Sequence, residues 1–154
     1  MGDWVGDEYG RLFRAEGDRL WRAVFAFSHD AEIASDAVAE AFAQCIRRGD
    51  QVQAPERWIW RSAFKIAAGE LNHRSHWSEL EREPQYEMPE GEGRVVIALR
   101  TLSPHQRAAV ILTDYAGYDA KAVGEMLECS SSTARVHLSR GRRKLRRLLE
   151  DGDA

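Results

Sequence analysis

Residues 119–149 read DAKAVGEMLECSSSTARVHLSRGRRKLRRLL, and this stretch decides the fold. Asp119 and Ser130 each precede a segment with helical apolar spacing, where a side-chain oxygen can accept hydrogen bonds from the unpaired amides that begin a helix. The first helix ends at Leu127, so that only Glu128 and the two residues after it form the turn. A short helix, a tight turn and a second helix with a basic face predict a helix-turn-helix.

Two positions of this motif are subject to special steric demands, one from helix packing and one from the backbone of the turn. Gly124 lies midway along the first helix, where two crossing helices need a small residue for close approach. Glu128 occupies the turn position that favours glycine, and a left-handed backbone there costs about 1 kcal/mol. We therefore expect the motif to form with local strain at Glu128.

The second helix of the motif has two different faces. Small and apolar residues repeat at spacings of four and three and predict the buried stripe: Ala134, Leu138, Gly141, Leu145 and Leu148. The opposite face carries Ser132, Arg135, Val136, Ser139, Arg140 and Arg143. Arginines suit guanine edges or phosphates, hydroxyls suit either, and valine suits a thymine methyl, so this face is suited to the major groove.

The charge of the second helix has three possible explanations. Seven of the thirteen residues from Arg135 to Arg147 are Arg or Lys. Such a run can be an ordinary solvated helix face, a segment that binds any polyanion, or one half of a device that reads DNA. The capped helix and the turn that precede it favour DNA binding.

The charge balance divides the chain into three parts. The 154 residues carry a net charge of −3, but residues 94–154 hold 11 basic and 7 acidic side chains. Residues 75–93 hold six Glu and one Arg, with two prolines and two glycines, and this composition predicts a flexible acidic linker. Residues 1–74 are close to balanced, with 10 basic and 12 acidic side chains. We expect two small domains joined by the linker.

Period-two alternation is nearly absent, so the chain is predicted to be all-α. Asp30 is expected to cap one helix, and Ser103-Pro104-His105-Gln106 forms a capping box for another. The second helix has an apolar stripe of Ala34, Ala37, Val38, Ala41, Phe42, Cys45 and Ile46. The expected helices span about 8–27, 31–48, 55–73, 94–101, 104–117, 120–127 and 131 onward.

Several classes of protein are disfavoured. No apolar run approaches the roughly 20 residues that span a bilayer, and the acidic N-terminus lacks a signal pattern, so neither membrane insertion nor export is expected. Cys45 and Cys129 form no disulfide framework, which favours the cytoplasm. His73 and His76 are interpreted as a polar helix end, and no metal or cofactor is predicted. The chain also lacks a phosphate loop or nucleophile elbow, so we expect no enzyme and no small-molecule substrate.

Three quoted segments resemble one known family in the same order along the chain. Residues 30–47 (DAEIASDAVAEAFAQCIR) and 54–74 (APERWIWRSAFKIAAGELNHR) resemble the polymerase-binding domain of RNA polymerase sigma factors of the extracytoplasmic-function group. Residues 102–149 (LSPHQRAAVILTDYAGYDAKAVGEMLECSSSTARVHLSRGRRKLRRLL) resemble the promoter-binding domain of the same group. The resemblance implies a core RNA polymerase partner, promoter DNA and promoter opening, and it leaves an anti-sigma partner open.

The resemblance also implies roles for matching positions. It makes residues 1–74 a region 2-like domain, 75–93 a linker along the RNA exit path, and 94–154 a region 4-like domain. The implied polymerase contacts are Asp36, Glu40 and Phe42. The implied minus-10 contacts, with the loop 48–54, are Arg48, Trp58, Arg61, Lys65 and Arg74. The implied minus-35 contacts are Ser132, Thr133, Arg135, Val136, Ser139, Arg140 and Arg143.

Three residues depart from the family pattern. Ala39 stands where the family has Gln, and Lys65 and Gly69 stand where it has Asn and Asp. The helix that contains Lys65 and Gly69 is also less basic than is usual in the family. These departures bear on the minus-10 sequence and on melting, and not on the fold.

Two alternatives follow from the sequence. The first is a sigma factor that melts promoters together with core polymerase. The second is a stand-alone helix-turn-helix regulator, or a sigma-like regulator without melting, and a stand-alone regulator is expected to bind a palindrome as a dimer. The chain lacks an obvious dimerisation helix, which favours the first. The roles of Trp58 and Trp60 also have two explanations, base stacking or core packing.

Overall fold

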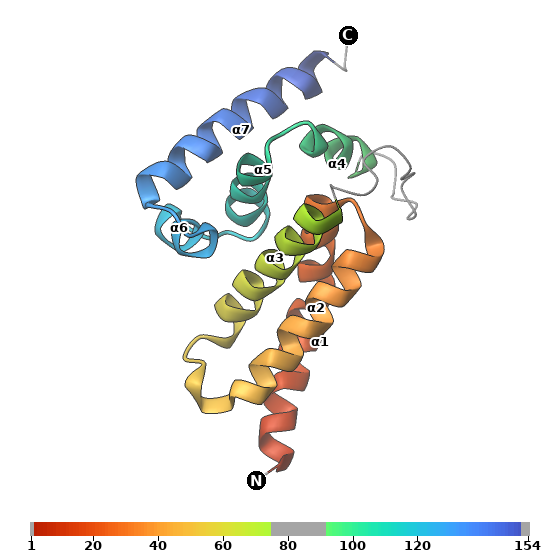
Figure 1. Ribbon diagram of the computed structural model, residues 1–154, viewed down its shortest axis with the longest axis vertical. Helices are drawn as coiled ribbons and strands as arrows, with labels where there is room; N and C mark the ends of the chain where they lie inside the picture. Colours follow the sequence, from red (N-terminus) through yellow and green to blue (C-terminus); the bar gives the residue numbers. More distant parts are fainter. Residues whose placement is uncertain (1, 75–91, 152–154) are drawn as a thin grey trace. The chain divides into compact units, whose positions relative to one another are not determined.

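The structure is a computed structural model that describes residues 2–74 and 92–151 (Figure 1). The chain divides into two compact units, Met1–Trp77 and Ser78–Ala154. All regular structure in the described residues is helical, which confirms the all-α prediction. None of the helices in these two ranges is long and apolar enough to cross a membrane.

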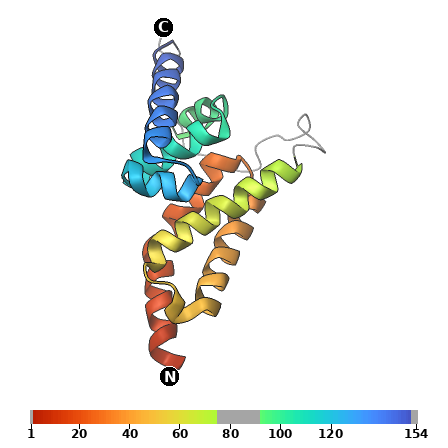
Figure 2. The same ribbon diagram turned by 60° about the vertical axis from the view of Figure 1, so that its left-hand side comes forward.

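The N-terminal unit contains three helices and one 3₁₀ turn. These elements are α1 (Gly2–Ser28), α2 (Ala31–Arg48), η1 (Gly49–Gln51) and α3 (Pro55–Arg74). The predicted cap is confirmed, because Asp30 Oδ1 accepts from the Ile33 amide at 3.0 Å. Gly49 ends α2 with φ +53°, a conformation that glycine adopts without strain. The three helices pack against one another as a bundle (Figure 2).

The core of this unit is built from one side of each helix. Its fully buried large side chains include Leu20 and Val24 of α1, Ile33 of α2 and Trp60 of α3. The stripe predicted for α2 is buried except at Ile46, where 51% of the residue is exposed. Each step of four residues turns about 40° around a helix, so Ile46 lies beyond the edge that the other helices cover.

The C-terminal unit contains four helices and a π-helical turn. They are α4 (Glu92–Arg100), α5 (Pro104–Val110), the π turn η2 (Ile111–Tyr115), α6 (Ala120–Leu127) and α7 (Ser131–Asp151). The capping box of Ser103 and Gln106 is confirmed. Because α4 begins at Glu92, the last two residues of the predicted linker are helical. Residues 75–91 lie outside the described residues, so the rest of the linker stays a prediction.

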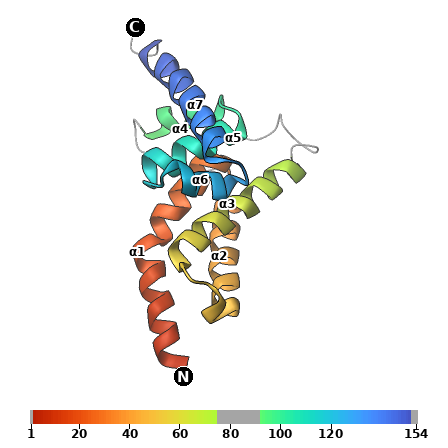
Figure 3. The same ribbon diagram turned by 90° about the vertical axis from the view of Figure 1, so that its left-hand side faces the viewer.

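Helix α7 packs across α5 and α6 and also contacts α4 (Figure 3). Ala134, Gly141 and Leu145 of the predicted stripe are buried, and Leu138 is half-buried. Leu148 was predicted to be buried but is 37% exposed. It lies only about 20° around the helix from buried Gly141 but two turns further along α7, so the helical period alone does not account for its exposure.

Two helical glycines differ in their surroundings and give a matched test. A Cβ at Gly141 would lie 2.8 Å from Val110 Cγ2 and 3.1 Å from the Gln106 carbonyl oxygen, whereas a Cβ at Gly69 meets nothing within 4 Å. We predict that Gly141→Ala lowers the free energy of unfolding of the C-terminal unit by about 1–3 kcal/mol through overpacking. Gly69→Ala should raise the free energy of unfolding of the N-terminal unit by about 0.5–1 kcal/mol, because alanine is more favourable than glycine inside a helix.

Urea denaturation followed by circular dichroism measures both effects. All five tryptophans lie in residues 1–77, so their fluorescence follows the N-terminal unit alone. Equal stability of the Gly141→Ala variant and the parent would contradict the close approach of α7 to α5.

Candidate nucleic-acid interface

The turn between α6 and α7 forms as the sequence predicts. Asp119 Oδ1 accepts from the Ala122 amide at 2.9 Å, and Ser130 Oγ accepts from the Thr133 amide at 3.0 Å. Glu128 adopts the left-handed conformation, with φ 59° and ψ 43°. The helix-turn-helix prediction is therefore confirmed, including its strained position.

Gly124 has a different role from the one predicted. A Cβ at this position would lie 2.7 Å from the Cys129 carbonyl oxygen and 3.2 Å from the Ser130 carbonyl oxygen. The small residue is therefore required by the backbone of the turn, which folds over α6. The predicted reason, the crossing of two helices, applies instead to Gly141 on α7.

All seven predicted minus-35 residues lie on α7 and are exposed: Ser132, Thr133, Arg135, Val136, Ser139, Arg140 and Arg143. Val136 is 44% exposed although it is apolar. The helix therefore presents hydroxyl, guanidinium and methyl groups on the side away from the buried stripe. These are the chemical groups that contact base edges and phosphates in a major groove.

Two cations of the basic run are held within the unit. Arg142 Nε donates to Asp114 Oδ2 at 3.0 Å, and Arg142 Nη2 donates to Asp114 Oδ1. These hydrogen bonds raise the pKa of Arg142. Lys144 Nζ donates to the Thr101 carbonyl oxygen at 2.8 Å. Sequence reasoning missed both contacts, because their partners lie far away along the chain.

A pair of stacked histidines lies between α5 and α7. The ring centroids of His105 and His137 are 5.2 Å apart, with an angle of 25° between the planes. Burial, then the neighbouring His105 and Arg140, lower the pKa of His137. His137 therefore adds less positive charge to α7 than an ordinary histidine would.

The predicted minus-10 residues lie in the N-terminal unit. Trp58 is half-buried, while Arg61 and Lys65 are exposed; their spacings of three and four place all three on one face of α3. The Arg48 guanidinium lies over the Trp58 ring, 5.5 Å from its centroid, so the structure brings these two residues together. Arg74 is the last residue of α3.

The structure separates the two tryptophans for which the sequence left two explanations. Trp60 is fully buried. Its ring stacks on Phe64, with the centroids 6.3 Å apart and the planes 14° apart. Trp60 therefore packs in the core, and Trp58 is the tryptophan with exposed surface.

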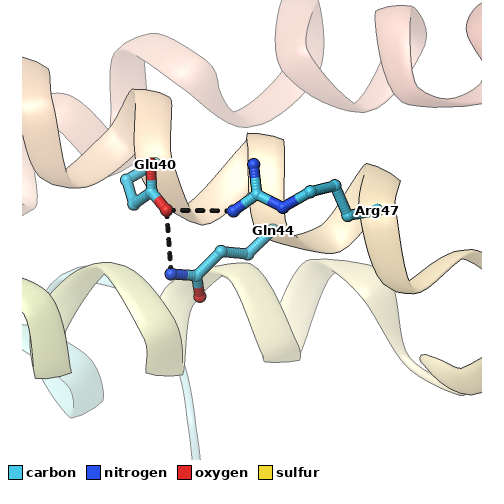
Figure 4. Close-up of polar contacts among 3 residues, drawn as sticks. All are labelled: Glu40, Gln44 and Arg47. Atoms are coloured by element: carbon cyan, nitrogen blue, oxygen red, sulfur yellow. Dashed lines mark hydrogen bonds and ion pairs between the residues drawn. The ribbon is translucent and has the colours of Figure 1, made fainter.

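The predicted polymerase-contacting residues lie on α2, but in different environments. Asp36 and Glu40 are exposed and one helical turn apart. Glu40 Oε1 accepts from Gln44 Nε2 at 3.0 Å and from Arg47 Nη2 at 3.1 Å (Figure 4). These hydrogen bonds, that of Gln44 first, lower the pKa of Glu40. The Glu40 carboxylate is therefore charged and held in place.

Phe42 does not share the surface of Asp36 and Glu40. It is 6% exposed, and its ring lies edge-on to Phe13 with the centroids 5.1 Å apart. Its place in the α2 stripe turns it toward α1. The Phe42 ring therefore packs between α2 and α1 and offers a partner little contact area.

A carboxyl pair lies at the start of α3. Burial and the neighbouring Glu16 carboxyl, which also hydrogen-bonds to Glu56, raise the pKa of Glu56, while Arg19 acts in the opposite direction. Arg19 Nη1 also lies 3.5 Å from Glu16 Oε2. The pair links α1 to α3.

The C-terminal unit matches a known family model. Residues 94–145 match the model described as sigma-70, region 4. The match begins in α4 and ends in α7, and therefore includes the helix-turn-helix and the seven exposed residues above.

Similar proteins extend the match to most of the chain. RNA polymerase sigma factor CarQ of Myxococcus xanthus is 26% identical over 96% of this chain and 92% of its own length. ECF RNA polymerase sigma factor SigM of Mycobacterium tuberculosis is 27% identical over 94% of this chain and 80% of its own. The fold is similar to that of the sigma factor RpoE from Bartonella quintana, solved with the anti-sigma factor NepR. That match has a TM-score of 0.77 at 18% identity and covers 93% of this chain and 97% of RpoE.

The carboxyl pair at the start of α3 predicts a pH-dependent effect. Because the pKa of Glu56 is raised on folding, its contribution to stability is present below the ordinary value of 4.5 and is lost as the pH rises through the folded value. Glu56→Gln should therefore stabilise the N-terminal unit at pH 7, by no more than about 0.5 kcal/mol, because the Glu56 side chain is only partly covered and water screens its charge.

Urea denaturation followed by tryptophan fluorescence at several pH values measures this difference. The gain of the Glu56→Gln variant over the parent should shrink as the pH falls below 4.5. A difference that does not change with pH would contradict a raised pKa.

Proposed function

We propose that this chain, which belongs to the RNA polymerase sigma factors of the extracytoplasmic-function group, binds core RNA polymerase, directs it to promoters and helps to open them. The observation that carries the proposal is the match to curated sigma factors from end to end. Both units are included in their order along the chain, which a stand-alone helix-turn-helix regulator has no reason to retain. The first of the two alternatives is thus favoured.

The C-terminal unit reads the minus-35 element through α7 in this proposal. Its exposed face offers Arg135, Arg140 and Arg143 for guanine edges and phosphates. Ser132, Thr133 and Ser139 add hydroxyl contacts, and Val136 suits a thymine methyl. The buried stripe lies on the other side, so α7 can enter a groove without losing its packing against α5.

The N-terminal unit contacts the minus-10 element in this proposal. Trp58 offers a partly exposed aromatic ring on which an unpaired base can stack. Every base has a flat aromatic face, so this contact does not depend on sequence. Arg48 lies against that ring, and Arg61 and Lys65 continue the same face of α3 with positive charge. Arg74 at the end of α3 is assigned to the same contact.

Asp36 and Glu40 on α2 form the proposed docking site for core polymerase. Both carboxylates are exposed, and Glu40 is oriented by Gln44 and Arg47. A partner with basic side chains fits this surface. Phe42 contributes to the docking site only indirectly, through its packing between α2 and α1.

The remaining assignments follow from the same family. Similarity to a sigma factor solved in complex with an anti-sigma factor supports an anti-sigma partner for this chain as well. We place the protein in the cytoplasm, where core polymerase and promoter DNA are. We assign it no catalytic activity, no cofactor and no small-molecule substrate.

The docking site predicts the effect of a double charge reversal. Asp36→Arg with Glu40→Arg should weaken association with core polymerase by about tenfold or more, because two attractive charges become repulsive. Helicity should be unchanged, since both side chains are exposed. Asp18→Arg on the exposed side of α1 is the matched control. Unchanged co-purification of the double variant with core polymerase would refute the docking assignment.

The recognition helix predicts separate effects for two kinds of arginine. Arg135→Ala and Arg140→Ala should each cost about 1–3 kcal/mol of discrimination at one base pair, because each removes a bidentate hydrogen bond to a base. Arg146→Ala should weaken binding to all sequences alike, as expected for a side chain that meets only phosphate.

Holoenzymes formed with each variant should be compared on promoters with intact and scrambled upstream elements. If Arg135→Ala and Arg140→Ala discriminate as well as the parent, α7 is wrongly assigned as the recognition helix.

A further inference from the structure

The buried stripe of α7 consists mostly of small residues. Its buried residues are Ala134, Gly141 and Leu145, and only Leu145 has a large side chain. Small residues allow close approach to α5, but they interlock weakly with the grooves of a neighbouring helix. Leu138 in the same stripe is only half-buried, so interactions beside the stripe can add to what holds the rotation of the helix.

Those interactions lie on the two margins of the stripe. Arg142 follows Gly141, and Lys144 precedes Leu145. At about 100° per residue, these positions place Arg142 and Lys144 on opposite sides of the buried stripe. Side chains at both margins are well placed to resist rotation of α7 in either direction.

Each margin is tied to a different element of the C-terminal unit. On one side Arg142 binds Asp114 of η2 through both oxygens of the carboxylate. On the other side Lys144 donates to the Thr101 carbonyl at the end of α4.

Both anchors of these hydrogen bonds are themselves held. Arg107 donates from Nε to the Leu99 carbonyl at 3.0 Å and from Nη2 to the Leu102 carbonyl at 3.1 Å, on either side of Thr101. Asp114 belongs to the π turn, which the Ala116 amide closes on the Ile111 carbonyl at 3.0 Å. The ties therefore connect α7 to fixed points.

We propose that Asp114 is a positioning residue of the recognition helix, which acts through Arg142 to set the rotation of α7 and hence the direction of Arg135, Arg140 and Arg143. The proposal rests on the proposed function of α7 as the minus-35 reader. It also divides the basic run: Arg142 and Lys144 belong to the scaffold, and the cations in the middle of the exposed face bind DNA.

Variants of the adjacent residues Arg142 and Arg143 can distinguish a structural role from phosphate binding. The salt dependence of DNA binding by holoenzyme reports the number of phosphates that the protein neutralises, and its slope changes by about 0.9 for each phosphate. Arg143→Ala should lower the slope by about that amount. Arg142→Ala should leave the slope unchanged, because Asp114 already neutralises this side chain. An equal fall for both variants would show that Arg142 binds phosphate, and it would overturn the proposal.

Asp114→Asn tests the positioning role directly. This variant should lose about tenfold in discrimination between intact and scrambled upstream elements, comparable to the removal of one hydrogen-bonded pair with a base. Its affinity for core polymerase should be unchanged. The charge swap Asp114→Arg with Arg142→Asp should restore discrimination, which a loss of general stability cannot explain. The inference is overturned if Asp114→Asn discriminates like the parent, or if the swapped variant folds and does not recover.

The parent holoenzyme separates the two possible failures. If the parent discriminates and Asp114→Asn does so equally, only the inference on Asp114 falls. If the parent does not discriminate between upstream elements, the proposed function falls and the inference falls with it. Circular dichroism of each variant shows whether the C-terminal unit is folded.

Discussion

The close approach of α7 to α5 at Gly141 is the constraint on which the C-terminal unit depends. The Val110 side chain and the Gln106 carbonyl lie so close to Gly141 that a Cβ at this position would crowd both of them. The interface is consequently narrow, and most of the circumference of α7 stays exposed. A wide apolar stripe would give a firmer helix, but it would cover positions that the proposed function needs for DNA.

Polar interactions beside this narrow interface add to the contacts that hold α7 in place. The pair of Arg142 and Asp114 and the hydrogen bond from Lys144 lie at its two margins. The basic run on α7 therefore contains side chains with different roles. Their charge is the same, so the roles can be told apart only from the hydrogen-bond partners of each guanidinium or ammonium group. A similar division occurs on α2, where Arg47 is engaged by Glu40.

The parts of the fold that follow from local signals could be predicted from the sequence. Asp30, Asp119 and the capping box of Ser103 are each decided within a few residues, and each forms as expected. Positions decided by packing between helices could not be predicted in this way. Asp114 and Arg142 are 28 residues apart, so no local pattern joins them.

The burial of individual side chains was predicted less well for the same reason. Trp58 and Trp60 lie on opposite faces of α3, and only the packing of α1 and α2 decides which face is covered. Phe42 is part of a helical stripe that the sequence shows, yet its implied role as a contact residue requires exposure. Among the site residues on α7, all but Thr133 were predicted to share an exposed face, because a helical period fixes their direction once the buried stripe is known.

The central claim is that this chain gives core RNA polymerase its choice of promoters. Its most direct test is in vitro transcription of genomic DNA from the source organism, with the 5′ ends of the transcripts sequenced. The reactions contain core polymerase with the chain, core polymerase alone, or the chain alone. We predict discrete start sites that share an upstream and a downstream element, and only when both proteins are present. Start sites that do not change when the chain is added, together with binding of a palindromic site by the chain alone, would contradict the account.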